Sequence, residues 1–410
     1  STWVAPNVPP AGNPTEDGPR VAKPDHERTW ETVLRAPFRV AFLPFRLLAR
    51  GIEGGANFAE THFPLQDLGK PKGPPTSVSV SPEFAFAGNE GFGAGAAVKG
   101  PLFNPHNQFK GDALWTMNDN RRVRLRTLFG QGSLLGVGAE GVYDYRPNRS
   151  FYGMGNDAGT RRTIFLEREN RADGWVSFGS DSTRRLRAIV GLSDVDIAPG
   201  YISRPRAVDV FSPSQVPFLT QGSRVKSYGL GGQFAALQKG GEPYAGMRLI
   251  GEARHVSSMG GGTNLRYESW RTEARGYVPV FSTRRVIALR GVYQGVDPDA
   301  GTDPIPFYRL PVSVKQNRFD AYSGERFRDK RLLLLQAEYR WLIWSSRLWA
   351  FALAQRGEVA PSTAAIRYAG MHESYGGGLR FHLSDAHAAR LEVAKGSGGV
   401  NIDLELDTWF

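Results

Sequence analysis

From about residue 76 to the C-terminus, side-chain polarity alternates with a period of two residues, and no other feature constrains the fold as strongly. In the segment RRVRLRTLF, Val123 and Leu125 alternate with arginines. The segments LRYESWRTEARGYV and RLLLLQAEYRW and the final ten residues, NIDLELDTWF, repeat the pattern. Successive side chains of a β-strand point to opposite faces, so the alternation predicts strands with one apolar face and one charged face.

Sixteen such segments can be delimited. They span residues 76–87, 91–100, 108–117, 121–130, 133–146, 162–179, 183–195, 222–238, 242–257, 264–281, 284–296, 330–341, 346–356, 374–384, 387–396 and 401–410. Most have ten residues or more, whereas a strand of a soluble protein has about five or six. A tilted strand needs about 9–11 residues to cross a bilayer. The segment lengths therefore favour membrane-spanning strands.

The connections between the segments sort into two kinds. Long connections follow the fifth, seventh, eleventh and thirteenth segments, at residues 147–161, 196–221, 297–329 and 357–373. Those after the even-numbered segments from the fourth to the fourteenth are short. Long loops on one rim and tight turns on the other are typical of outer-membrane barrels. A soluble sandwich could also place the charged face in water, but it has no reason to sort its loops in this way.

The chain contains no window of about 18 uninterrupted apolar residues, so a closed barrel is the remaining way for it to span a membrane. We therefore predict an all-β fold, a closed antiparallel transmembrane β-barrel of about 16 strands over residues 76–410, with a short N-terminal helical extension. The expected location is a bacterial outer membrane, after removal of a signal peptide, with the four long loops outside the cell. The first and last strands are expected to pair, because closure removes the open sheet edge.

The N-terminal quarter has a different composition. Residues 1–27 are rich in Pro and Gly and predict an extended tail, and residues 54–75 predict a linker. Between them, residues 28–53 predict an amphipathic helix that prolines interrupt. Its apolar stripe contains Trp30, Phe38, Phe42 and Phe45. The stripe can pack on the rest of the protein, lie on the inner leaflet or dock a partner protein through residues 1–53.

Composition excludes several function classes. The chain has 51 basic and 40 acidic residues, but the arginines are spread through the strands rather than gathered in one stripe, which argues against nucleic-acid binding. The absence of cysteine excludes disulfides and thiolate chemistry. His372, His382 and His387 fall on different rims or faces of the predicted strands and do not form a metal site. The sequence predicts no cofactor.

One short segment, HVSS at 255–258, carries the elements of a serine hydrolase. His255 and Ser257 share a strand face, so His255 could act as base for that hydroxyl. No orienting residue is evident in the sequence around it. We therefore predict no catalytic residues, and a lipid-active hydrolase remains an alternative.

Three further segments resemble a known family. SFYGMGND (150–157), GERFRDKRLLLLQAEYRW (324–341) and GGGLRF with the terminal DTWF resemble, in order and spacing, segments of the BamA/TamA-like bacterial surface antigen superfamily. The resemblance covers about 76–410. It implies a sixteen-stranded outer-membrane barrel whose sixth extracellular loop turns into the lumen. Members that assemble or translocate proteins carry POTRA domains, and none fits residues 1–75, so the expectation is a barrel-only member.

The resemblance also implies a lock between that loop and the barrel wall. In the family, an Arg of an Arg-Gly-Phe/Tyr triplet pairs with an Asp on a later strand. Aligned backwards from the RFRD segment that contains Arg326, the triplet falls on Asp320, Ala321 and Tyr322, and the strand position falls on Gln355. Both charges of the family's pair are thus replaced, and a lone buried charge would cost roughly 3–5 kcal/mol. In an altered register, Arg318 or Arg356 could restore a pair.

The C-terminus resembles the signal that outer-membrane assembly machinery reads during insertion, and its residues here are Leu404, Leu406 and Phe410. The predicted function is that of a non-enzymatic barrel that binds, anchors or helps to translocate a partner, with loop 297–329 folded into the lumen. The expected surroundings are the outer-membrane bilayer and its lipopolysaccharide leaflet. A passive pore is the main alternative.

Overall fold

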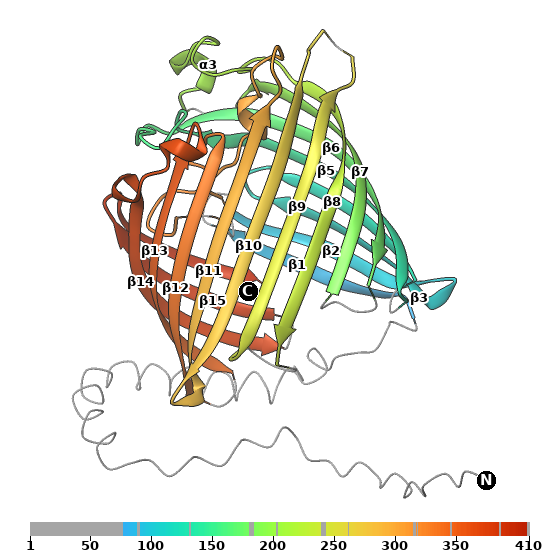
Figure 1. Ribbon diagram of the computed structural model, residues 1–410, viewed down its shortest axis with the longest axis vertical. Helices are drawn as coiled ribbons and strands as arrows, with labels where there is room; N and C mark the ends of the chain where they lie inside the picture. Colours follow the sequence, from blue (N-terminus) through green and yellow to red (C-terminus); the bar gives the residue numbers. More distant parts are fainter. Residues whose placement is uncertain are drawn as a thin grey trace, which may run out of the picture. The chain divides into compact units, whose positions relative to one another are not determined.

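The computed structural model describes residues 77–87, 91–130, 133–179, 184–201, 204–238, 243–260, 262–314, 317, 319–344, 347–384 and 387–407. The predicted tail, helix and linker of residues 1–75 lie outside the described residues, as do Arg318 and Phe410. The described chain forms one sheet of sixteen antiparallel strands in sequence order (Figure 1). This confirms the predicted antiparallel all-β fold and its strand number.

The strands have the following bounds. They are β1 (Ser79–Ala87), β2 (Gly91–Leu102), β3 (Asn104–Thr116), β4 (Arg121–Phe129), β5 (Leu135–Phe151), β6 (Thr163–Phe178), β7 (Arg184–Pro199), β8 (Ser223–Leu237), β9 (Gly246–Ser258), β10 (Arg266–Val280), β11 (Ser282–Pro298), β12 (Arg331–Trp344), β13 (Leu348–Ala360), β14 (His372–Ser384), β15 (His387–Gly396) and β16 (Gly399–Asp407). Several strands run further than predicted. β5 continues five residues past its predicted end, because a register shift between Arg146 and Arg149 lets its ladder with β6 resume beyond the irregularity.

The alternation sorts side chains between two faces as predicted. On β16, Ile402 is 69% exposed and Leu404 39% exposed, whereas Asp403 between them is 7% exposed. Large apolar side chains are exposed on the same outer face of many other strands: Val123, Leu125, Val176, Leu186, Val190, Leu230, Leu289, Leu335, Leu391 and Val393. An apolar band of this extent is stable against lipid rather than against water. No helix among the described residues is long and apolar enough to span a membrane.

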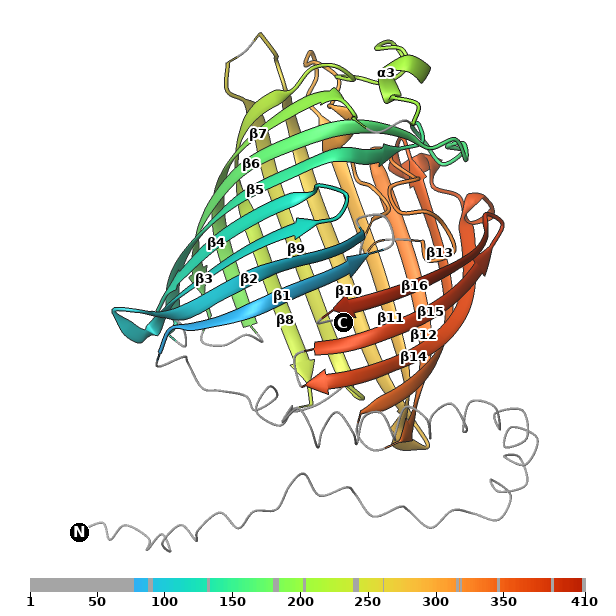
Figure 2. The same ribbon diagram turned by 180° about the vertical axis from the view of Figure 1, so that it is seen from behind.

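The two edge strands lie beside each other without a shared ladder. The sheet curls so that Cα atoms of β1 and β16 come within 8 Å (Figure 2). No backbone pairing joins these strands in the described residues, so the prediction of a sheet closed by hydrogen bonds is not confirmed.

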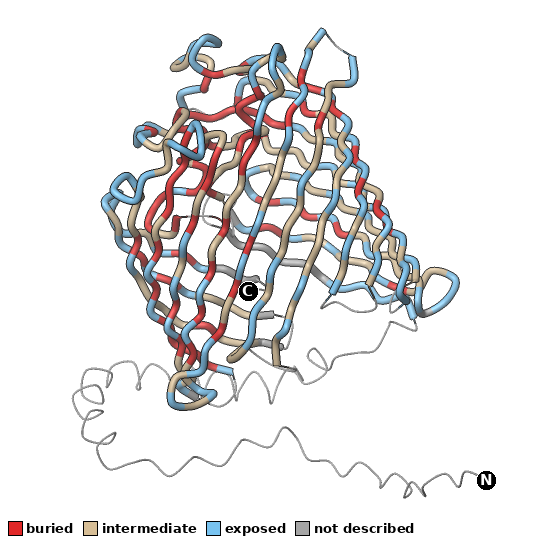
Figure 3. The backbone as a smooth tube through the Cα atoms, in the orientation of Figure 1, coloured by how far each residue is buried: buried red, intermediate tan, exposed pale blue. Residues whose placement is uncertain are grey.

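The long connections gather at one rim, opposite the short turns (Figure 1). They hold the short helical segments α3 (Ala207–Val210), η2 (Phe307–Arg309), η4 (Thr363–Ala365) and η5 (Tyr368–Gly370). The connection between β11 and β12, residues 299–330, is called the inserted loop below. Its side chains belong to three clusters of buried apolar residues, and buried residues are frequent toward the long-loop rim (Figure 3). The inserted loop therefore supplies much of the core at this end of the lumen.

Candidate functional site: the lumen and its inserted loop

The tip of the inserted loop docks on the wall formed by β13–β16. The Asp320 backbone N–H donates to Gln355 Oε1 at 2.8 Å, and Gln355 Nε2 donates to Asp320 Oδ2 at 3.3 Å. Asn401 Nδ2 on β16 donates to the Asp320 carbonyl at 2.9 Å. Asp320 also lies near enough to Arg390 for their charges to interact. The two positions that the resemblance paired are thus in contact, with the acid now on the loop.

The next residues continue this docking. The Ala321 N–H donates to Ser374 Oγ at 3.1 Å, and the Tyr322 hydroxyl shares a hydrogen bond of 2.8 Å with Ser397 Oγ. The Phe327 ring stacks on His372 at 4.1 Å. Loop and wall therefore meet through both backbone hydrogen bonds and ring contacts.

Two arginines of the predicted lock take other roles. Arg326 Nε donates to the Ala158 carbonyl at 3.3 Å, which ties the inserted loop to the β5–β6 connection. Arg356 forms an ion pair with Glu373 and lies 4.1 Å from the Tyr368 ring centroid. Asp320 is not its ion-pair partner, and neighbouring Gln355 and Gly357 point to the opposite, luminal face. Side chains of Leu406 and Phe410 lie outside the described residues.

A second anchor, which the sequence did not predict, holds the base of the inserted loop. Arg149 on β5 lies between two carboxylates: its Nε is 2.6 Å from Glu325 Oε1, and it also pairs with Glu167. The Ser150 N–H donates to Glu325 Oε2 at 3.2 Å. Burial alone would raise the pKa of Glu325, but the guanidinium of Arg149, helped by other arginines, holds this pKa below its usual value. Glu325 is therefore a buried carboxylate kept ionised by Arg149.

Arg328 of the inserted loop is fully buried, with 0% exposure. Its Nη1 donates to the Phe307 carbonyl at 2.9 Å, and its Cζ lies 5.5 Å from the Phe307 ring centroid. Burial, with repulsion from Arg149, lowers the pKa of Arg328 to about 10. Its carbonyl accepts the Gly155 N–H at 2.8 Å, which couples the inserted loop to the glycine-rich segment after β5. The guanidinium of Arg328 therefore links two parts of the inserted loop, and the Arg328 carbonyl links that loop to the β5–β6 connection.

The tip has one close approach that a small substitution should break. A Cβ on Gly357 would lie 2.3 Å from Phe319 Cε1, so Gly357→Val is expected to displace the loop tip, at a cost of roughly 1–3 kcal/mol. Trypsin cleavage after Arg328 should then be faster than in the parent protein. Gly276→Val is the matched control, because a Cβ there meets no atom within 4 Å. Equal cleavage of both variants would contradict the packing described for Phe319.

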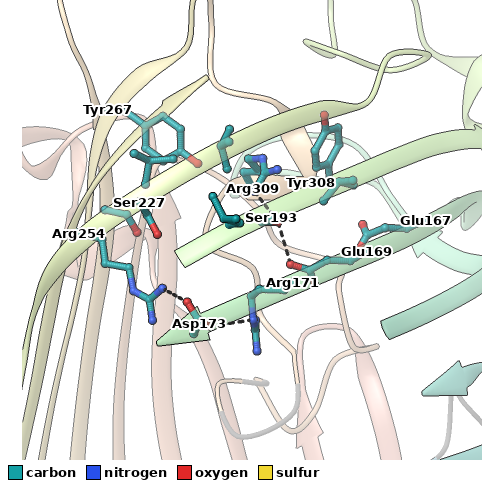
Figure 4. Close-up of a pocket in the computed structure, with 15 residues that line it drawn as sticks. Glu167, Glu169, Arg171, Asp173, Ser193, Ser227, Arg254, Tyr267, Tyr308 and Arg309 are labelled. Atoms are coloured by element: carbon teal, nitrogen blue, oxygen red, sulfur yellow. Dashed lines mark hydrogen bonds and ion pairs between the residues drawn. The ribbon is translucent and has the colours of Figure 1, made fainter. Parts of the chain in front are cut away.

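A cavity of about 240 Å³ lies between the inserted loop and strands β6–β10 (Figure 4). Its charged lining side chains are Glu167, Glu169, Asp173, Arg171, Arg254 and Arg309. Asp173 accepts a hydrogen bond from Arg254 Nη1 at 2.7 Å and forms an ion pair with Arg171, whose Nε lies 3.2 Å away. The carboxylate of Asp173 is thus held from two strands.

The loop side of the cavity is linked to the wall through serines. Arg309 donates to Ser223 Oγ at 2.8 Å and to Ser193 Oγ at 3.3 Å, and Ser193 in turn donates to Glu169 at 3.2 Å. Burial raises the pKa of Tyr308 to about 12, so this hydroxyl stays protonated and donates to the Gln221 carbonyl. The lining is polar and largely self-satisfied. It suits water or a small polar solute.

The luminal wall divides into two parts with different electrostatics. On β10–β15, buried arginines meet buried carboxylates. Glu273 Oε1 lies 2.5 Å from Arg275 and 2.9 Å from Arg290. Glu338 lies 2.6 Å from Arg340 and 2.9 Å from Arg390. We call this part the paired wall, and its ladder stabilises the lumen as a network.

On β2–β9, the short-turn half of the luminal wall carries cations of another kind. We call the following six residues the cationic wall: Lys99, Lys110, Arg126, Arg185, Arg187 and Arg248. None of them has a carboxylate within ion-pair distance among the residues that the structure describes. Within those residues there is also no cluster of three side chains suited to a metal ion. Alternation in the sequence places arginines on these strands, but it does not distinguish paired arginines from unpaired ones.

No protein-family model and no curated protein matches this chain. Solved structures do. The crystal structure of BamA from Haemophilus ducreyi lacking POTRA domains 1–3 is similar with a TM-score of 0.61 and 14% identity, over 81% of this chain and 70% of that chain. The fold is that of the BamA and CdiB barrels.

The similarity to CdiB barrels rests on two solved structures. CdiB from Escherichia coli has a TM-score of 0.53 at 11% identity, and CdiB from Acinetobacter baumannii has 0.50 at 10% identity. The chain spans 63% and 59% of these two CdiB chains, less than two thirds of either. The resemblance to the BamA/TamA-like superfamily is thus confirmed for the fold.

Proposed function

We propose that this chain is a barrel of the bacterial outer membrane that binds, anchors or helps to translocate a protein partner, and that it is not an enzyme or a general pore. The position of the inserted loop is the main support for this proposal. The loop places an apolar core and two polar anchors inside the long-loop half of the lumen, where a general porin needs an open channel.

The apolar outer face supports the membrane placement. In this placement the long loops face outward through the lipopolysaccharide leaflet, and the short turns face the periplasm. β1 and β16 close the barrel in the bilayer, because an open sheet edge is costly in lipid. The C-terminal strand is then the part that the assembly machinery reads during insertion.

The partner-binding element is residues 1–53, whose stripe of Trp30, Phe38, Phe42 and Phe45 is flanked by arginines. Gentle native extraction should therefore recover the full-length barrel with a stoichiometric partner, and deletion of residues 1–53 should release that partner. Substituting the four aromatic residues with Ser, while keeping the length of the chain, separates docking from simple tethering. A full-length barrel that extracts alone and conducts ions would replace this function with that of a passive pore.

A specific contact favours one second candidate, a lipid-active hydrolase. The structure supplies the orienting acid that the sequence did not reveal: His255 Nδ1 lies 2.7 Å from Glu268 Oε1 on the adjacent strand. Ser257 lies two residues further along β9, on the same outer face. The described residues show no hydrogen bond between His255 and Ser257, so the nucleophile is not activated in this structure. Covalent labelling of Ser257 by a fluorophosphonate would establish this reaction.

A further inference from the structure

The cationic wall lies within a few residues of the short-turn rim. Arg185 is the second residue of β7, and Arg248 is the third residue of β9. Arg126 is the fourth residue from the end of β4. The inserted loop docks near the opposite rim, so it leaves this end of the lumen uncovered.

Three of the cations form a row across neighbouring strands. Lys99 on β2 is directly opposite Lys110 on β3, and Lys110 is directly opposite Arg126 on β4. Directly opposed like charges destabilise a sheet. A row of three is therefore unfavourable unless an anion offsets it.

Two carboxylates near the cationic wall are held by other arginines. Glu140 lies opposite Arg126 in the ladder, but the ion pair that it forms is with Arg171, at 3.6 Å. Glu252 pairs with Arg254 at 2.7 Å. Glu140 and Glu252 therefore act on Arg187 only at a distance, and no described carboxylate forms an ion pair with the cationic wall.

Two of these cations contact the same aromatic ring. The Cζ atoms of Arg126 and Arg187 lie 5.2 Å and 5.8 Å from the Trp175 ring centroid. The positive charges of Arg126 and Arg185 both act on Arg187. Nε atoms of Arg126, Arg185 and Arg248 are buried without a hydrogen-bond partner among the described residues. Buried unpaired donors of cationic groups cost free energy, which a bound anion would recover.

We propose that the cationic wall binds an acidic segment of a polypeptide that enters the lumen from the short-turn rim. This rests on the proposed function, because it gives the chemistry of a partner or client. The length of the wall favours an extended ligand: β2 and β9 are seven strand spacings apart, or roughly 30 Å along the wall. A single small anion would neutralise only a fraction of that length. The paired wall provides no such site, because its arginines already meet carboxylates.

The test uses the full chain in detergent and two probes, hexaglutamate and inorganic triphosphate, with affinity measured by calorimetry at two salt concentrations. Hexaglutamate is expected to bind, to weaken with salt, and to lose about tenfold or more in affinity in the Arg126→Ala/Arg187→Ala variant. The Arg126→Lys/Arg187→Lys variant keeps the charges and should keep most of the affinity. Lys226→Ala removes a cation from the outer face and should change nothing. Heat-modifiable gel migration establishes that each variant is folded.

No binding of hexaglutamate to the parent protein would overturn the proposal, as would equal losses in the alanine variant and in Lys226→Ala. Binding of triphosphate alone would replace the acidic segment with a small-anion site. These outcomes leave the proposed function standing, because that function fails only if the full-length barrel extracts alone and conducts ions.

Discussion

Removing the tip of the inserted loop is expected to open the lumen. Val312 and Arg328 form an antiparallel bridge, so replacing residues 313–327 with Gly-Gly joins two adjacent backbones by a tight turn. The variant loses the contacts of Asp320, Tyr322 and Glu325 with the wall in one step. Its single-channel conductance in planar bilayers should rise on the order of tenfold above that of the parent protein, toward the behaviour of a water-filled barrel.

Another connection at the same rim provides the control. Replacing residues 259–263 between β9 and β10 with Gly-Gly keeps Asn264, which hydrogen-bonds Gly301 and Asp303 of the inserted loop, and should leave the conductance unchanged. Opened channels should also prefer anions, because the cationic wall then lines the conducting path. A parent protein with a large steady conductance would show that the inserted loop is no plug, and the pore alternative would take its place.

Alternation in the sequence predicted the faces of the strands because one face meets lipid and the other meets the lumen. Asp403 between Ile402 and Leu404 is a case where parity alone fixed the environment. Closure was another matter. It depends on how the backbones of β1 and β16 meet, which the pattern of apolar residues does not describe.

The contact of Asp320 with Gln355 was accessible only through the family resemblance, because 35 residues separate the two positions. Arg149 and Glu325 are 176 residues apart, and neither stands out among the many charged residues of the chain. Arg149 lies beyond the predicted end of its strand at residue 146, and the register shift between Arg146 and Arg149 changes its parity, so alternation does not place it beside Glu167. Because strand alternation does not show where the inserted loop lies, neither the second anchor nor the burial of Arg328 could be predicted from the sequence.

Breaking the second anchor is expected to release the inserted loop. Arg149→Met keeps most of the side-chain volume but leaves the carboxylates of Glu167 and Glu325 close together without their shared cation. Both carboxylates are about nine-tenths buried, so the cost should reach roughly 3–5 kcal/mol, equivalent to a factor of about 100 or more in the population of the released loop. The chain has no cysteine, so Ala321→Cys, at a position 4% exposed, reports release through the rate of maleimide labelling.

The same reporter distinguishes lost charge balance from lost packing. Arg149→Met/Glu325→Gln removes one of the two opposed carboxylates, so labelling should slow again toward the parent rate if repulsion between them drives release. Arg168→Met removes an equal charge from an exposed pair with Asp196 on the outer face, and labelling should stay at the parent rate. If the double variant labels as fast as Arg149→Met, packing around the substituted side chain rather than charge balance displaces the loop. If Arg149→Met labels no faster than the parent, the contacts of Asp320 and Tyr322 hold the loop without help from Glu325.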